Sequence, residues 1–270
     1  IGCSNAVSEL IYKCVTCRKL RGKFRGQKMS DLPIDRIEPT PPFTCVGVDF
    51  FGPFYVKEGR KQLKRYGALF TCLVLRAIHI EVAVSLSTDS FINVLRRFLA
   101  IRGPIQLLRS DCGTNFIGSK SEQTRAEEEI DQNRVKEFLL QKGCDYIEYK
   151  TNVPKASHMG GAWERQIRTV RNVLNALLKN TSSQLDDDSL RTLMYEVSAI
   201  VNSRPLTTDN VNDPLSLKPL SPNQILTSKS EFLLPPPGDF DKSDLYSRKM
   251  WRRVQHLATE FWKRWQKEYI

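Results

Sequence analysis

The sequence lacks a long uninterrupted hydrophobic run, a secretory leader and a disulfide framework. Its best apolar run, residues 68–75, ends at Arg76 and falls well short of the roughly 20 residues that a membrane-spanning helix needs. Lys13, Arg18 and Lys19 come early with no apolar segment among them, so no signal peptide is predicted. Seven cysteines, an odd number spread over 270 residues, do not suit a disulfide-stapled domain. We therefore expect a protein outside the membrane, in the reducing interior of a cell.

Histidine is also scarce, with only His79, His158 and His256 in the whole sequence. Cys14 and Cys17 form a C-x-x-C pair, which is half of a tetrahedral zinc site and needs two further ligands. No histidine precedes the pair to complete the site. Either the sequence begins after the missing ligands or the pair binds no zinc, and we expect the former.

Acidic residues are fewer than basic residues. Lysine and arginine number 41 against 30 aspartates and glutamates, which gives a net charge of +11 and a pI near 9.4. Such an excess favours a polyanionic partner, most plainly nucleic acid. The alternative is a basic surface with no special partner. A hydrophobic content of 40% is enough to build a core.

The hydrophobic pattern predicts a mixed sheet flanked by helices. A helix that Asp89 caps and Gly103-Pro104 ends follows three strands, and later strands alternate with helices. Antiparallel strands followed by this alternation predict a mixed five-stranded α/β fold. The predicted strands are 44–56, 66–75, 78–84, 105–110 and 146–149, and the remaining predicted helices are 134–141, 162–178, 187–201 and 251–265.

Three acidic residues stand in settings that suit a metal site. Asp49 interrupts an apolar strand, Asp111 follows another strand directly, and Glu164 opens a basic helix after a glycine pair. A carboxylate in an apolar strand costs free energy unless it is paired, and two-metal phosphodiester chemistry needs several carboxylates at one point. If the first and fourth strands are neighbours, Asp49 and Asp111 lie close together. The structural alternatives are an ordinary ion pair, a turn residue and a helix-terminal acid.

The helix after Glu164 carries a basic face. Arg168 and Arg171 follow the glutamate by four and seven residues, so all three share one side of the helix. The arginines would then hold a DNA backbone beside the metal site. The alternative is a surface ion pair between Glu164 and Arg168.

Several short motifs occur together with these residues and cover nearly the whole chain. They are Cys14-Val15-Thr16-Cys17-Arg18, Pro42-Phe43, Val48-Asp49-Phe50-Phe51-Gly52-Pro53, Ser110-Asp111-Cys112-Gly113-Thr114-Asn115-Phe116, Ser157-His158-Met159-Gly160-Gly161-Ala162-Trp163-Glu164-Arg165, Asn202-Ser203-Arg204-Pro205-Leu206 and Leu220-Ser221-Pro222. Together with the helix at 251–265, this set resembles retroelement integrases. It is most similar to the BEL/Pao class of long-terminal-repeat retrotransposons.

The resemblance implies a ribonuclease-H-like core with two Mg²⁺ or Mn²⁺ ions held by Asp49, Asp111 and Glu164. It implies 3′-end processing of element DNA and strand transfer into host DNA, by a homo-multimer in the nucleus after a cytoplasmic particle stage. Lys155 and Arg165 join Arg168 and Arg171 as expected DNA-binding residues.

The resemblance also implies a division into domains. Residues 1–32 would be the second half of a His-His-Cys-Cys zinc domain, with zinc bound by Cys14 and Cys17 only in a longer parent protein. Residues 33–230 would be the catalytic core, and residues 231–270 a linker and basic, aromatic helix that begins a truncated C-terminal domain.

One departure concerns the residue after the second aspartate, where this family usually has asparagine and this chain has Cys112. Asparagine tolerates left-handed backbone better than cysteine does. This departure leaves open a catalytically decayed or domesticated copy that binds DNA. A further alternative is a ribonuclease H, which shares the core of the integrases that the chain resembles.

Overall fold

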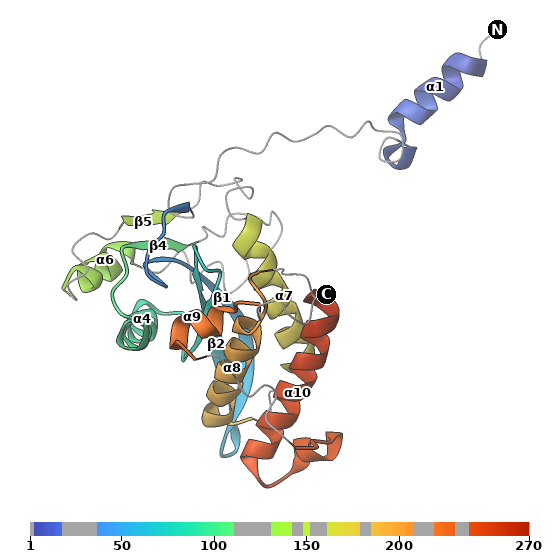
Figure 1. The fold of residues 1–270 in the computed structure, drawn as a ribbon. Coiled ribbons are helices and arrows are strands. Elements are labelled where there is room, and N and C mark those ends of the chain that lie inside the picture. Colours follow the sequence, from blue (N-terminus) through green and yellow to red (C-terminus); the bar gives the residue numbers. More distant parts are fainter. Residues whose placement is uncertain are drawn as a thin grey trace. The chain divides into compact units, whose positions relative to one another are not determined.

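The computed structural model describes residues 3–17, 37–110, 131–141, 148–151, 161–178, 185–207, 219–229 and 238–269 (Figure 1). The chain divides into two units, Ile1–Pro33 and Ile34–Ile270, and each is described by itself. In the first unit, helix α1 (Cys3–Lys13) precedes Cys14, and a short helical turn covers residues 15–17. This helix was not predicted from the sequence.

The second unit is built on a mixed sheet with the strand order β3-β2-β1-β4-β5. The first three strands are antiparallel, whereas β4 runs parallel to both β1 and β5. The mixed α/β class is therefore confirmed. The first and fourth strands are neighbours, which is the condition under which Asp49 and Asp111 were expected to lie close together. The strands are β1 (Cys45–Glu58), β2 (Lys61–Cys72), β3 (Ile78–Ala83), β4 (Leu107–Ser110) and β5 (Glu148–Thr151).

A long hairpin joins β1 to β2 through a turn at Gly59, whose φ of 62° suits glycine. The pairing shifts register between Phe51 and Phe54. Opposite Phe51 stands Gly67, where an added Cβ would lie 2.4 Å from the Phe51 ring, so only glycine fits. Sequence analysis placed the start of β2 at Tyr66, but it begins five residues earlier because the exposed end of the hairpin pairs without an apolar pattern.

Helices cover both faces of the sheet (Figure 1). Val46, Val48 and Phe50 of β1 share a core with α4 (Thr88–Arg102) and α6 (Gln132–Gln141). Phe51 points to the other face, in a second core with α7, α8 and α10. These last helices span Gly161–Leu178, Asp187–Asn202 and Met250–Tyr269, and the short helices α9 and η3 span Pro222–Thr227 and Lys242–Tyr246.

Helix α4 begins earlier than predicted. Its N-cap is Ser87, whose side chain accepts a hydrogen bond from the backbone N–H of Ser90, so the prediction of Asp89 as the cap was wrong. Asp89 lies in the first turn and pairs with Arg134 of α6 at 3.1 Å. Serine and aspartate are both good caps, so composition alone did not decide between them. The predicted stop at Gly103 is confirmed, with a φ of 86°.

The basic, aromatic helix α10 packs on α7 and α8 in the same core as the sheet. Phe261 and Trp265 are buried, whereas Trp251 at its start is 55% exposed. None of the helices in the described ranges is long and apolar enough to span a membrane.

Candidate active site

Asp49 lies in the central strand β1, on the face that α7 covers. Its Oδ2 accepts a hydrogen bond from Nη1 of Arg171 at 3.0 Å, and the two side chains are 23% and 36% exposed. Arg171 was predicted from the sequence to bind DNA, and its ion pair with Asp49 was not predicted. The contact joins residues 122 positions apart, so only the fold could reveal it.

The register of β1 and β4 bears directly on the second predicted acid. Val48 is the Cα partner of Ser110, the last residue of β4. The next residues along the two strands are Asp49 and Asp111. Asp111 itself lies outside the described residues, as do Cys112 and Lys155.

Helix α7 carries the third predicted acid and the basic residues around it. Its buried stripe contains Val170, Leu174 and Leu177. Arg168 is exposed. The structure describes the backbone of Glu164 and Arg165 but not their side chains.

Of the three carboxylates predicted to bind Mg²⁺ or Mn²⁺, the structure describes the side chain of Asp49 only. Among the residues that the structure describes, no three His, Cys, Asp or Glu side chains gather as metal ligands. Asp49 suits Mg²⁺ or Mn²⁺ in its chemistry, because a partly exposed carboxylate supplies the hard oxygen that these ions take. Arg171 already places positive charge at this carboxylate.

In the first unit, Cys14 and Cys17 are free thiols. Hydrogen bonds from the backbone and then the side chain of Cys17 lower the pKa of the Cys14 thiol, against a smaller opposing effect of burial. The thiolate is the form that binds metals, so this environment suits the predicted half of a zinc site. The remaining zinc ligands stay a prediction.

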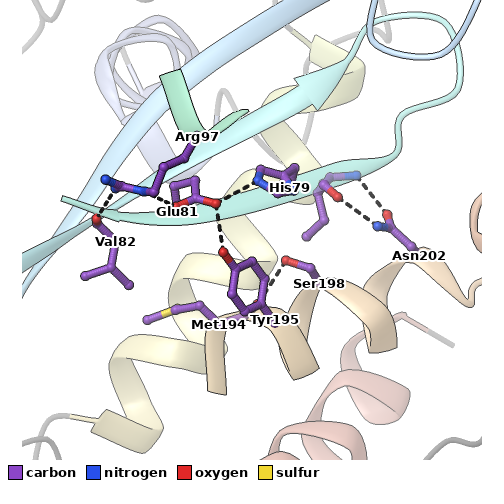
Figure 2. Close-up of polar contacts among 9 residues, drawn as sticks. His79, Glu81, Val82, Arg97, Met194, Tyr195, Ser198 and Asn202 are labelled. Carbon is purple, nitrogen blue, oxygen red and sulfur yellow. Dashed lines mark hydrogen bonds and ion pairs between the residues drawn. The ribbon is translucent and has the colours of Figure 1, made fainter. Parts of the chain in front are cut away.

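A buried carboxylate, Glu81 of β3, was not predicted from the sequence (Figure 2). Its side chain is fully buried. Oε1 accepts hydrogen bonds from His79 Nε2 at 3.0 Å and from the Tyr195 hydroxyl at 2.9 Å, and Oε2 accepts one from Arg97 Nε at 2.7 Å. His79 must carry its proton on Nε2, because an ionised carboxylate can only accept. The signal was present in the sequence, since His79 and Glu81 are the polar positions of an otherwise apolar strand.

The environment of Glu81 keeps it ionised. Burial alone raises the pKa of Glu81, but hydrogen bonds from His79 and Arg97, the charge of His79 and the Tyr195 hydroxyl together hold it below its ordinary value. Burial and the negative charge of Glu81 in turn raise the pKa of Tyr195. Asn202 lies near this cluster and bonds the backbone N–H and C=O of Ile78 at 2.8 and 2.7 Å (Figure 2).

No protein-family description and no curated protein matches this chain. Among solved structures, it is similar to a chain in the cryo-EM structure of the simian T-cell lymphotropic virus intasome in complex with PP2A regulatory subunit B56 gamma. The two chains are 12% identical with a TM-score of 0.48, and the match covers 88% of this chain and 70% of the other. A similarity at this level assigns no function and no residue to this chain.

Proposed function

We propose that this chain is the catalytic part of a retroelement integrase of the BEL/Pao class, with a ribonuclease-H-like core. It would cut near the 3′ ends of element DNA and join the freed 3′-hydroxyls to host DNA. The observation that carries the proposal is the position of Asp49, on a central strand whose parallel neighbour β4 leads directly into Asp111.

The register supports a shared site for the two aspartates. Val48 and Ser110 are paired across β1 and β4, and parallel strands place equivalent positions at one edge. We expect Asp111 to face the same side as Asp49, because each residue follows one member of this pair.

The contact between Arg171 and Asp49 supports the proposal that Glu164 also faces β1. It fixes which face of α7 is turned toward β1. Glu164 precedes Arg171 by seven residues, or about two helical turns, so we expect it on that same face, roughly 10 Å nearer the N-terminus of the helix. A helix in this orientation would bring the third carboxylate to the side of the sheet where Asp49 lies.

Asp49, Asp111 and Glu164 would hold two Mg²⁺ or Mn²⁺ ions, which when bound would stabilise charge during an in-line displacement at phosphorus. Arg171 balances the charge of Asp49 in the described structure. With that charge balanced by other means, Arg171 would turn to a DNA phosphate, together with Lys155, Arg165 and Arg168. Zinc binding at Cys14 and Cys17, a homo-multimer and a nuclear location belong to the same proposal.

A strand-transfer assay with element-end DNA and Mg²⁺ or Mn²⁺ tests the proposal. We expect Asp49→Asn, Asp111→Asn and Glu164→Gln each to reduce product by at least about 100-fold, because each removes a carboxylate on which the transition state depends. Asp89→Asn is the matched control, since Asp89 is also an aspartate paired with an arginine but contacts α6 instead. Full product from Asp49→Asn would exclude its catalytic role.

The alternative of a decayed copy has one observation in its favour, Cys112 in place of the usual asparagine. It predicts salt-sensitive DNA binding by the unmutated chain without any cleavage or joining. Restoration of product by Cys112→Asn would identify that position as the cause.

A further inference from the structure

A groove on the α4 side of β3 is separate from the proposed carboxylate site. Its volume is about 550 Å³. Helix α4 packs on the opposite face of the sheet from α7, so the sheet stands between this groove and the helix that contacts Asp49. The groove is lined by Val84, Ser85, Ser90, Asn93, Arg96 and Arg97.

Arg97 forms a fixed cationic wall of the groove. Its Nε donates to Glu81 and its Nη2 donates to the carbonyl of Val82, both at 2.7 Å (Figure 2). These two bonds use two of the five N–H donors of the guanidinium, and the side chain remains 37% exposed. The buried Glu81 therefore holds Arg97 in place and leaves donors for a ligand.

Arg96 supplies a second positive charge, with an exposed side chain. No ion pair of Arg96 occurs among the residues that the structure describes. The acid in the first turn of α4, Asp89, is already paired with Arg134 of α6. Among the described residues that line the groove, two are arginines and none is acidic.

The remaining polar lining consists of hydrogen-bond donors of the kind that contact nucleic-acid backbones. Ser85, Ser90 and Asn93 present hydroxyl and amide groups beside the two guanidiniums. Arginine, serine and asparagine side chains bind phosphate oxygens without regard to base sequence. The net charge of +11 further favours a polyanion over a single small anion.

We propose that this groove binds the phosphodiester backbone of a nucleic-acid strand and forms a second DNA-contacting surface of the chain. The choice of DNA as the polyanion rests on the proposed integrase function. The evidence for the groove itself is the position of Arg97, the exposed Arg96 and the lack of an acid among the described residues of its lining.

Fluorescence anisotropy with a labelled mixed-sequence DNA duplex tests the groove, using the full chain in EDTA at several salt concentrations. We expect Arg96→Ala to weaken binding about fivefold and to reduce the salt slope by about one, as for the loss of one phosphate contact. Arg60→Ala removes the same charge from the exposed β1–β2 turn and is the matched control. Equal effects of the two variants would overturn the proposal.

Asn93→Asp provides a second variant that leaves both arginines intact. It places a carboxylate in the groove, so we expect it to weaken duplex binding at least as much as Arg96→Ala does. Unchanged binding would count against the groove. Thermal melting checks that both variants fold, which we expect because both side chains are exposed.

Competition with inorganic phosphate and with a polyglutamate peptide tests whether the groove prefers DNA to other anions. Inorganic phosphate should displace the duplex no better than chloride at equal ionic strength, and a polyglutamate peptide should bind with no dependence on Arg96. Arg96-dependent binding of either competitor, as tight as that of the duplex, would assign the groove to free phosphate or to an acidic protein instead. Because the measurement needs no catalysis, missing strand transfer together with Arg96-dependent binding would refute only the integrase proposal.

Discussion

Two carboxylates in strands of the same sheet have different environments. Glu81, on the edge strand β3, is fully buried and accepts hydrogen bonds from His79, Arg97 and Tyr195. Asp49, on the central strand β1, is 23% exposed and pairs with Arg171 at 3.0 Å. A buried carboxylate surrounded by donors maintains the architecture, whereas a partly exposed one can exchange its partner for a ligand.

The largest expected effect on stability is at Glu81. Glu81→Gln should lower the free energy of unfolding by about 3 kcal/mol, because the substitution removes the buried charge and leaves Arg97 facing an amide. Urea unfolding followed by circular dichroism measures the change. A loss below about 1 kcal/mol would mean that Glu81 is not the structural member of the pair.

The pH dependence of this loss follows from the lowered pKa of Glu81. In the unfolded chain Glu81 titrates near its ordinary value of 4.5, and in the folded chain it titrates below that value. The stability that it contributes is therefore present above about pH 4.5 and is lost as the pH falls through the folded pKa. Unfolding curves of the parent and of Glu81→Gln should keep a constant gap above that pH and converge below it. A gap that widens in acid would contradict this sign.

A smaller effect is expected at the other end of β3. Asn202→Ala should cost about 2 kcal/mol, because the buried N–H and C=O of Ile78 both lose their side-chain partner. Hydrogen exchange should rise at Ile78 first. Exchange that rises equally throughout β1 would show that the edge strand does not open on its own.

The smallest stability effect is expected at Asp49. Asp49→Asn should change the free energy of unfolding by less than about 1 kcal/mol, since partly exposed ion pairs contribute little. Added Mg²⁺ should raise the melting temperature of the parent but not of this variant. A loss as large as that of Glu81→Gln would remove the contrast between the two carboxylates.

The fold was more predictable than the contacts within it. Periodicity located helices such as α7 and α8 because each buries one regular stripe, for example Val170 and Leu174 of α7. It missed the first residues of β2, where Lys61 and Gln62 are exposed and pair through the hairpin turn. Short elements such as α9 offered too few residues for a period.

The candidate site was predictable in part for the same reason. An aspartate in an apolar strand drew attention to Asp49. The pairing of β1 with β4 was only a condition of the predicted site, and the structure shows it. The partner of Asp49 was not predictable, because Arg171 approaches it only once α7 packs on the sheet. Glu81 was not predicted as a buried carboxylate, although His79 and Glu81 alternate with apolar residues in β3.

The edge strand β3 also limits how copies of this chain can associate. Asn202 occupies both backbone groups of Ile78, and Arg97 occupies the carbonyl of Val82. An incoming strand would have to displace two buried or half-buried side chains before it could extend the sheet. Extension of the sheet at this edge by a second copy would therefore cost the hydrogen bonds of both side chains, which disfavours open-ended sheet growth.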